Sequence, residues 1–151
     1  MWNKDRSTLL SVIIIKICYG LLAACCIAAP WIVGMYDKTY ITDAGLPSLF
    51  AALLVTLYVA AVPALAAVIC LDRLLGNIRK GEPFITKNVT CLRVISYCCF
   101  AESLIFIYFA TQRTFAWFVV IAFAFMGLIL RVVKNVFQQA VSIREENDFT
   151  I

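Results

Sequence analysis

Four long apolar runs occupy most of this chain and leave it few ways to fold. They span residues 9–33, 46–71, 89–110 and 115–130, and the last continues as a mixed pattern to residue 143. A helix needs about 20 residues to cross the hydrocarbon core of a bilayer, so each run is long enough once its polar ends reach the headgroups. No run alternates with a period of two residues, as barrel strands would. The runs therefore predict transmembrane helices.

The predicted fold is all-α, a polytopic membrane four-helix bundle made of two helical hairpins. We expect one membrane domain over residues 1–151, with helices at about 9–33, 46–71, 89–110 and 115–137, a linker at 72–88 and a tail at 144–151. With 64% hydrophobic and 15% charged residues, the chain leaves no room for a soluble domain.

The positive charges are divided unevenly between the two sides of this arrangement. Of the thirteen Lys and Arg residues, five lie in the segment 71–93. The residues near both termini add further positive charge on the same side, whereas only Lys38 and Arg113 fall in the loops on the other side. Cytoplasmic loops of membrane proteins are enriched in Lys and Arg. We therefore expect both termini and the linker to face the cytoplasm.

The second and fourth helices are expected to extend into the cytoplasm. Apolar residues continue at i, i+3, i+4 and i+7 beyond the second run, at Leu71, Leu74, Leu75 and Ile78. This extension should end at Gly81, and Thr86 is the predicted N-cap of the third helix. The fourth helix carries a matching apolar stripe at Val132, Val133, Val136, Phe137, Ala140 and Val141.

Small residues recur at four-residue spacing on the first two helices, at Gly20, Ala24 and Ala28 and at Ala52, Thr56, Ala60 and Ala64. Small side chains let helix backbones approach closely in lipid, so these stripes predict an antiparallel pair. Pro63 should kink the second helix near its middle. Such a kink is usually structural, although transporters also place binding sites at broken helices.

Glu102 is an acidic residue deep inside an apolar run. A carboxyl group there marks a proton relay, a cation site or a site for a basic ligand, or else it fixes helix packing. Lys16 reaches a similar depth on a helix that runs in the same direction, so we hypothesise a Lys16–Glu102 salt bridge. The alternative is that Lys16 extends to the headgroups. Cys91, Cys98 and Glu102 share one helix face, as a polar pocket wall or as packing residues.

The chain lacks the patterns that metal binding and catalysis require. It has no histidine, and its seven cysteines form no C-x-x-C spacing, so we expect no metal site, no cofactor and reduced cysteines that pack. It has no nucleophile with a base, no Gly-rich phosphate loop and no paired carboxylates, which predicts a protein that is not an enzyme. An enzyme would need a second polar group converging on Glu102 or on a cysteine.

The segment Leu22 to Cys25 also matches a bacterial lipoprotein cleavage box, and cleavage there would remove the first helix. Lys16 lies in the middle of the preceding apolar run and argues against cleavage. We therefore expect four helices.

The linker region has two interpretations. Its charge orients the protein and attracts anionic lipid. Alternatively, it docks a cytosolic partner on the two helical extensions. The residues of this candidate surface are Arg73, Arg79, Lys80, Phe84, Lys87 and Arg93.

The central segment and the tail resemble a bacterial family, through Gly81, Pro83, Phe84, Asn88, Leu92 and Arg93 and the ending Asp148 to Ile151. Its members are small four-helix membrane proteins of unknown function, many encoded beside a small Cro/repressor-type helix-turn-helix protein. The resemblance implies a multi-pass protein of the bacterial cytoplasmic (inner) membrane. Its expected partners are the lipid bilayer and that small regulator, with no direct contact to nucleic acid, and homo-oligomerisation is left open.

Two functions follow from these features. The leading one is an accessory or regulatory protein that couples a membrane event to a small cytosolic DNA-binding partner. The alternative is a small transporter, a ligand-binding bundle or an immunity protein against a membrane-active peptide, using Glu102 and Lys16. A cavity that reaches Glu102 would favour the alternative.

Overall fold

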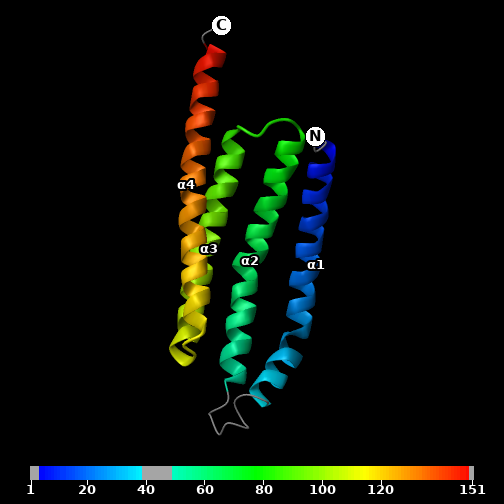
Figure 1. Cartoon of the computed structure of the whole chain (residues 1–151), viewed down its shortest axis with the longest axis vertical. Helices are drawn as coiled ribbons and strands as arrows, with labels where there is room; N and C mark the ends of the chain where they lie inside the picture. Colours follow the sequence, from blue (N-terminus) through cyan, green and yellow to red (C-terminus); the bar gives the residue numbers. More distant parts are fainter. Residues whose placement is uncertain (1–3, 39–48, 150–151) are drawn as a thin grey trace.

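The computed structural model describes residues 4–38 and 49–149, and their side chains within 9–38 and 49–147. It contains the helices α1 (Lys4–Tyr36), α2 (Phe50–Arg79), α3 (Thr86–Gln112) and α4 (Ala116–Phe149) (Figure 1). All four are long and apolar enough to cross a membrane. The chain therefore has the predicted all-α membrane four-helix fold. Most of the predicted outer loop, at 39–45, the predicted start of the second helix, at 46–48, and the last two residues lie outside the described part.

The helices pack in the order of the sequence. α2 contacts α1 and α3, and α3 contacts α4 (Figure 1). The start of α1, the α2–α3 linker and the end of α4 lie at one end of the molecule, and the short α3–α4 turn lies at the other. The two predicted hairpins are confirmed, and the cytoplasmic orientation of the termini and the linker stays a prediction.

Both predicted helical extensions are present. α2 continues to Arg79 and ends in a Schellman motif, in which Gly81 N–H donates to Ile78 O at 3.1 Å and Glu82 N–H to Asn77 O at 3.2 Å. Gly81 has a φ of +80°, which glycine adopts without a steric penalty. α4 has 34 residues. At a rise of about 1.5 Å per residue it is about 51 Å long, and it projects beyond the other helices (Figure 1).

The predicted N-cap of α3 is wrong by one residue. Ile85 is the N-cap, with an extended backbone at φ −129° and ψ 150°, and no side chain caps the helix. Thr86 is already helical, and its carbonyl accepts a hydrogen bond from the Thr90 hydroxyl at 3.2 Å. The backbone turns one residue earlier because the carbonyl of Ile85 already accepts the N–H of Asn88 at 2.9 Å.

The small-residue stripe is correct on α2 and wrong on α1. On α2, Thr56 and Ala60 are buried, as predicted. On α1, Gly20 is exposed, and a Cβ atom added there would meet nothing within 4 Å. α1 instead buries Ile15, Ala29 and Val33. α1 lies at one edge of the bundle and packs mainly against α2. Larger side chains can therefore fill this interface.

Serine hydroxyls and one glycine hold α3 against α4. Ser96 Oγ donates to Gly127 O at 2.9 Å, and Ser103 Oγ donates to Val120 O at 3.0 Å. A Cβ atom on Gly127 would lie 3.1 Å from the ring of Phe100, so the glycine makes room for this ring. In lipid the hydrophobic effect does not drive helices together, and close packing and interhelical hydrogen bonds do so instead.

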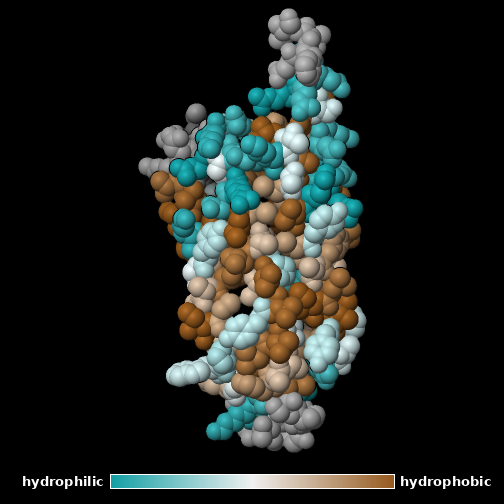
Figure 2. Space-filling model, turned by 180° about the vertical axis from the view of Figure 1, so that it is seen from behind, coloured by the Kyte–Doolittle hydropathy of each residue, from teal (hydrophilic) through white to brown (hydrophobic). Residues whose placement is uncertain are grey.

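The surface agrees with a membrane location. Hydrophobic residues cover the middle of the molecule, and hydrophilic ones gather at the end that carries the linker (Figure 2). Ile27 is 81% exposed and Trp31 is 83% exposed on α1. Apolar side chains with this exposure are stable when they face lipid instead of water.

Candidate functional site

Glu102 lies in the middle of the bundle on α3, the helix that packs against both α2 and α4. Its side chain is only 5% exposed. Cys98, one turn earlier, is buried on the same face, and Cys91 is half-buried. The predicted common face of Cys91, Cys98 and Glu102 is therefore confirmed.

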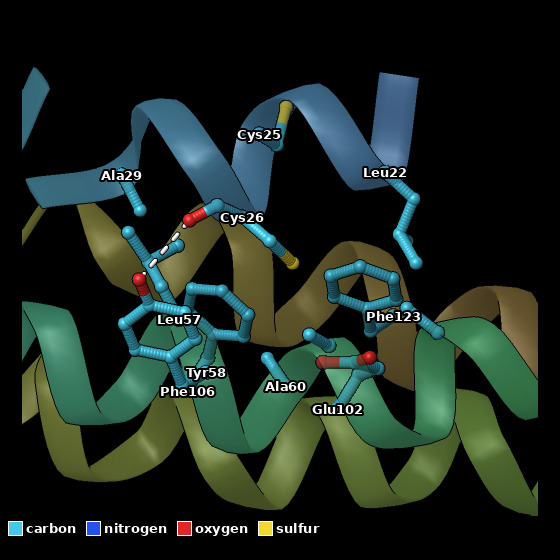
Figure 3. A pocket seen from close by; sticks show the side chains of 12 residues that line it. Leu22, Cys25, Cys26, Ala29, Leu57, Tyr58, Ala60, Glu102, Phe106 and Phe123 are labelled. Carbon is cyan, nitrogen blue, oxygen red and sulfur yellow. Dashed lines mark hydrogen bonds between the residues drawn. The ribbon is translucent and has the colours of Figure 1, made fainter. Parts of the chain in front are cut away.

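A cavity of about 230 Å³ opens in front of Glu102. We call it the Glu102 cavity. All four helices contribute to its wall, and Glu102 is the charged residue in an otherwise mostly apolar lining. Figure 3 shows the carboxyl group, the Phe123 ring and the Cys26 side chain around the same space. Alanines of α2 line the cavity at Ala60, Ala61 and Ala64, and these short side chains leave the space open.

The Glu102 carboxyl group is incompletely partnered. Within the described residues, Oε2 is buried and has no hydrogen-bond partner. The group also lies within hydrogen-bonding reach of the Ala64 backbone on α2. A buried polar atom without a partner is costly, the more so in a membrane. Glu102 therefore lines the cavity with one carboxyl oxygen left without a hydrogen-bond partner among the described residues.

Pro63 directly precedes Ala64 and lies inside α2, which continues on both sides of it. Proline has no N–H and opens the hydrogen-bond ladder of a helix. This places a helix position that lacks a backbone hydrogen-bond donor next to the residue whose backbone lies near Glu102. The kink expected at Pro63 stays a prediction, and its position beside the cavity is the observation that matters for function.

Lys16 and Glu102 are not brought together. Lys16 is exposed, and its amino group lies 5.9 Å from the centre of the Tyr19 ring. It is not part of the Glu102 cavity. α1 packs along α2, which separates most of α1 from α3. The hypothesised salt bridge therefore does not form in this structure, and the alternative of an exposed Lys16 describes it better.

A tyrosine that the sequence did not indicate closes part of the Glu102 cavity. Tyr58 on α2 donates its hydroxyl hydrogen to the carbonyl of Cys26 on α1 at 3.0 Å (Figure 3). Both residues line the cavity. In the sequence Tyr58 is one aromatic residue in an apolar run, and nothing in its spacing distinguishes it from a lipid-facing side chain.

The predicted linker surface and the α3–α4 turn lie at opposite ends of the molecule. Arg73, Arg79, Lys80, Lys87 and Arg93 are all exposed there. Phe84 packs on Phe137 of α4, with ring centres 5.5 Å apart, and its carbonyl accepts a hydrogen bond from Arg144 Nη1 at 3.5 Å. The linker and the extension of α4 therefore form one surface.

The sequence of residues 10–151 matches a family described as "Protein of unknown function (DUF2975)". The chain belongs to this family. The match begins within α1 and covers the other three helices, the Glu102 cavity and the linker, so the DUF2975 region includes nearly the whole membrane domain. No curated protein and no solved structure matches the chain.

The cysteines of this DUF2975 chain are free within the described residues. No group of three or more His, Cys, Asp or Glu side chains within this described part is arranged to hold a metal ion. Cys70 on α2 and Cys91 on α3 lie close enough for their thiols to interact across the α2–α3 interface.

Proposed function

We propose that this chain is a non-enzymatic membrane protein that binds a lipophilic ligand with a cationic or hydrogen-bond-donating group in the Glu102 cavity. The observation that carries this proposal is Glu102, which lines the cavity and whose buried Oε2 has no hydrogen-bond partner among the described residues. A ligand that donates to this oxygen would supply the missing hydrogen bond.

The lining favours a ligand that is otherwise apolar. Phe106 and Phe123 offer aromatic faces, on which cationic groups bind well. Cys25 and Tyr58 line the cavity and are also exposed on the outer surface of the bundle. A ligand dissolved in the bilayer would therefore enter from the side.

Ethidium, a fluorescent lipophilic aromatic cation, is a suitable probe for the protein in detergent micelles. We expect saturable binding to the wild type, and binding weaker by about tenfold or more in Glu102→Gln, which corresponds to at least about 1.4 kcal/mol. Lys16→Met is the matched control, because it alters the other intramembrane charge away from the cavity, and its binding should equal that of the wild type. Equal binding by Glu102→Gln and the wild type would reject the proposal.

The orientation proposed is that of a multi-pass protein of the bacterial inner membrane with both termini in the cytoplasm. The excess of Lys and Arg at the end that carries the linker supports it. A C-terminal fusion to green fluorescent protein should fluoresce, and one to alkaline phosphatase should be inactive, because this phosphatase folds only in the periplasm. The reverse pattern would reject this orientation.

A second candidate function is coupling to a small cytosolic regulator of the helix-turn-helix class. The contact of Phe84 with Phe137 favours it, since it joins the linker and α4 into one surface beside the exposed Arg79 and Lys80. This role involves no direct contact with nucleic acid, and a homo-oligomer would present the surface more than once.

A pull-down with the full chain as bait tests this second function. The wild type should recover a small soluble helix-turn-helix protein, and the double variant Arg79→Glu with Lys80→Glu should not. The control is Lys38→Glu, which changes an exposed charge at the other end of the helices. This variant should bind the regulator as the wild type does. Retention of the regulator by the linker variant would remove this surface as the docking site.

A further inference from the structure

A second cavity, of about 220 Å³, lies between α3 and α4 and is polar and strongly basic. Its lining residues are Arg93, Ser96, Tyr97, Arg131 and Lys134. Three of these five are cationic, and none is acidic. We call it the α3–α4 basic cavity. It shares no residue with the Glu102 cavity.

The helix geometry explains why these charges converge. Arg93 and Tyr97 are four residues apart on α3, and Arg131 and Lys134 are three apart on α4, so each pair occupies one helix face. The hydrogen bond from Ser96 to Gly127 fixes the register of the two helices at this level. Gly127 lies one turn before Arg131, so the same register brings the two basic pairs to one cavity.

The arrangement is built to receive an anion. Three like charges around one space repel each other unless a negative group neutralises them. The guanidinium of Arg131 lies 5.9 Å from the centre of the Tyr97 ring, and this cation–π contact holds it toward α3. The guanidinium group of Arg can donate two parallel hydrogen bonds to phosphate oxygens, whereas the ammonium group of Lys acts as a point charge.

The depth of the cavity favours a lipid over a free anion. Arg93 is seven residues from the start of α3, which is about 10 Å along the helix and corresponds to the headgroup region. Below it, toward the middle of the membrane, Tyr97 and Leu104 share one face of α3 and are 54% and 68% exposed. This face can carry an acyl chain whose phosphate lies among the three cations.

We propose that the α3–α4 basic cavity binds the phosphate of an anionic phospholipid of the phosphatidylglycerol class. Arg93, Arg131 and Lys134 donate to the phosphate oxygens, and the Tyr97 ring lies along the glycerol and acyl chain. Ser96 is not a ligand donor, because its hydroxyl hydrogen is already bonded to Gly127. The bound lipid would join α3 to α4 at the end that carries the linker.

Native mass spectrometry of the full chain, with dioctanoyl phosphatidylglycerol and dioctanoyl phosphatidylcholine as probes, tests this site. The wild type should retain phosphatidylglycerol preferentially. Arg131→Gln with Lys134→Gln should weaken this binding by about tenfold or more. Arg79→Gln with Lys80→Gln removes the same charge at the same end but outside the cavity, and should leave the preference intact.

Each other outcome overturns the proposal. Equal retention of the two lipids by the wild type would show that no headgroup site exists, and this comparison holds even if the double variant fails to fold. Equal loss of phosphatidylglycerol in both double variants would show that only net charge matters. If inorganic phosphate at the same concentration displaced the lipid, the site would be one for free phosphate.

Discussion

Asn77 on α2 donates its side-chain amide hydrogen to the side-chain oxygen of Asn88 on α3 at 2.7 Å. The amide of Asn88 in turn donates to the carbonyls of Glu82 and Pro83, at 3.1 and 2.8 Å. Asn88 is completely buried. One side chain therefore joins the end of α2, the linker and the start of α3, and it fixes the segment that presents the basic residues.

Replacement of Asn88 by alanine should destabilise the protein. It leaves the Asn77 amide and two linker carbonyls without partners, which costs about 1–3 kcal/mol for each polar group that stays buried. Thermal unfolding in detergent measures the effect. Asn135→Ala, at an exposed position on α4, is the control and should melt as the wild type does. An unchanged melting temperature for Asn88→Ala would show that the linker does not depend on this residue.

Gly127→Leu should destabilise the α3–α4 hairpin, whereas Gly20→Leu should not. The ring of Phe100 occupies the space that a side chain at Gly127 needs, and nothing lies within 4 Å of a Cβ atom at Gly20. Overpacking costs about 1–3 kcal/mol, and an exposed substitution about 0.5 kcal/mol or less. Phe100→Ala should partly restore the stability of Gly127→Leu. A similar loss at both glycines would contradict the close contact.

Lys16→Met and Glu102→Gln should affect stability additively. The amino group of Lys16 lies over Tyr19, and Glu102 faces its own cavity, so the two side chains share no contact. For independent sites the double variant should equal the sum of the single variants within about 0.5 kcal/mol. Unfolding of the wild type, the two single variants and the double variant in the same detergent gives the double-mutant cycle. A larger coupling energy would show that Lys16 and Glu102 interact, as the sequence suggests.

Cys70 and Cys91 should form a disulfide when the membrane is treated with copper–phenanthroline. Their thiols lie close together across the α2–α3 interface, and oxidation transfers two electrons to the reagent and releases two protons as the S–S bond forms. In a variant with the other five cysteines replaced by alanine, both thiols should resist maleimide–polyethylene glycol after oxidation. A variant that keeps only Cys18 and Cys91 is the control and should stay reactive, because α1 and α3 are not packed neighbours. Labelling of both pairs would contradict the α2–α3 packing.

The candidate site was only partly predictable. Glu102 stands out in the sequence because a carboxyl group in an apolar run is rare and costly. Lys16 stands out for the same reason, but the expected pairing depended on which face of α1 meets the bundle. Small residues suggested the face with Gly20, whereas the structure buries Ile15, Ala29 and Val33. Tyr58 and the α3–α4 basic cavity gave no local signal, because each is defined by contacts between helices.

By itself the sequence determines that this chain forms four membrane-length helices, that α2 stops just before Gly81 and that the basic residues gather at one end. Hydrophobic length, glycine conformation and the order of the loops are local properties, and they do not depend on how the helices rotate. Only the tertiary structure decides that Glu102 faces a cavity away from Lys16 and that Arg93, Arg131 and Lys134 meet. Those encounters depend on helix rotation and register, which are set by contacts between distant residues such as Ser96 and Gly127.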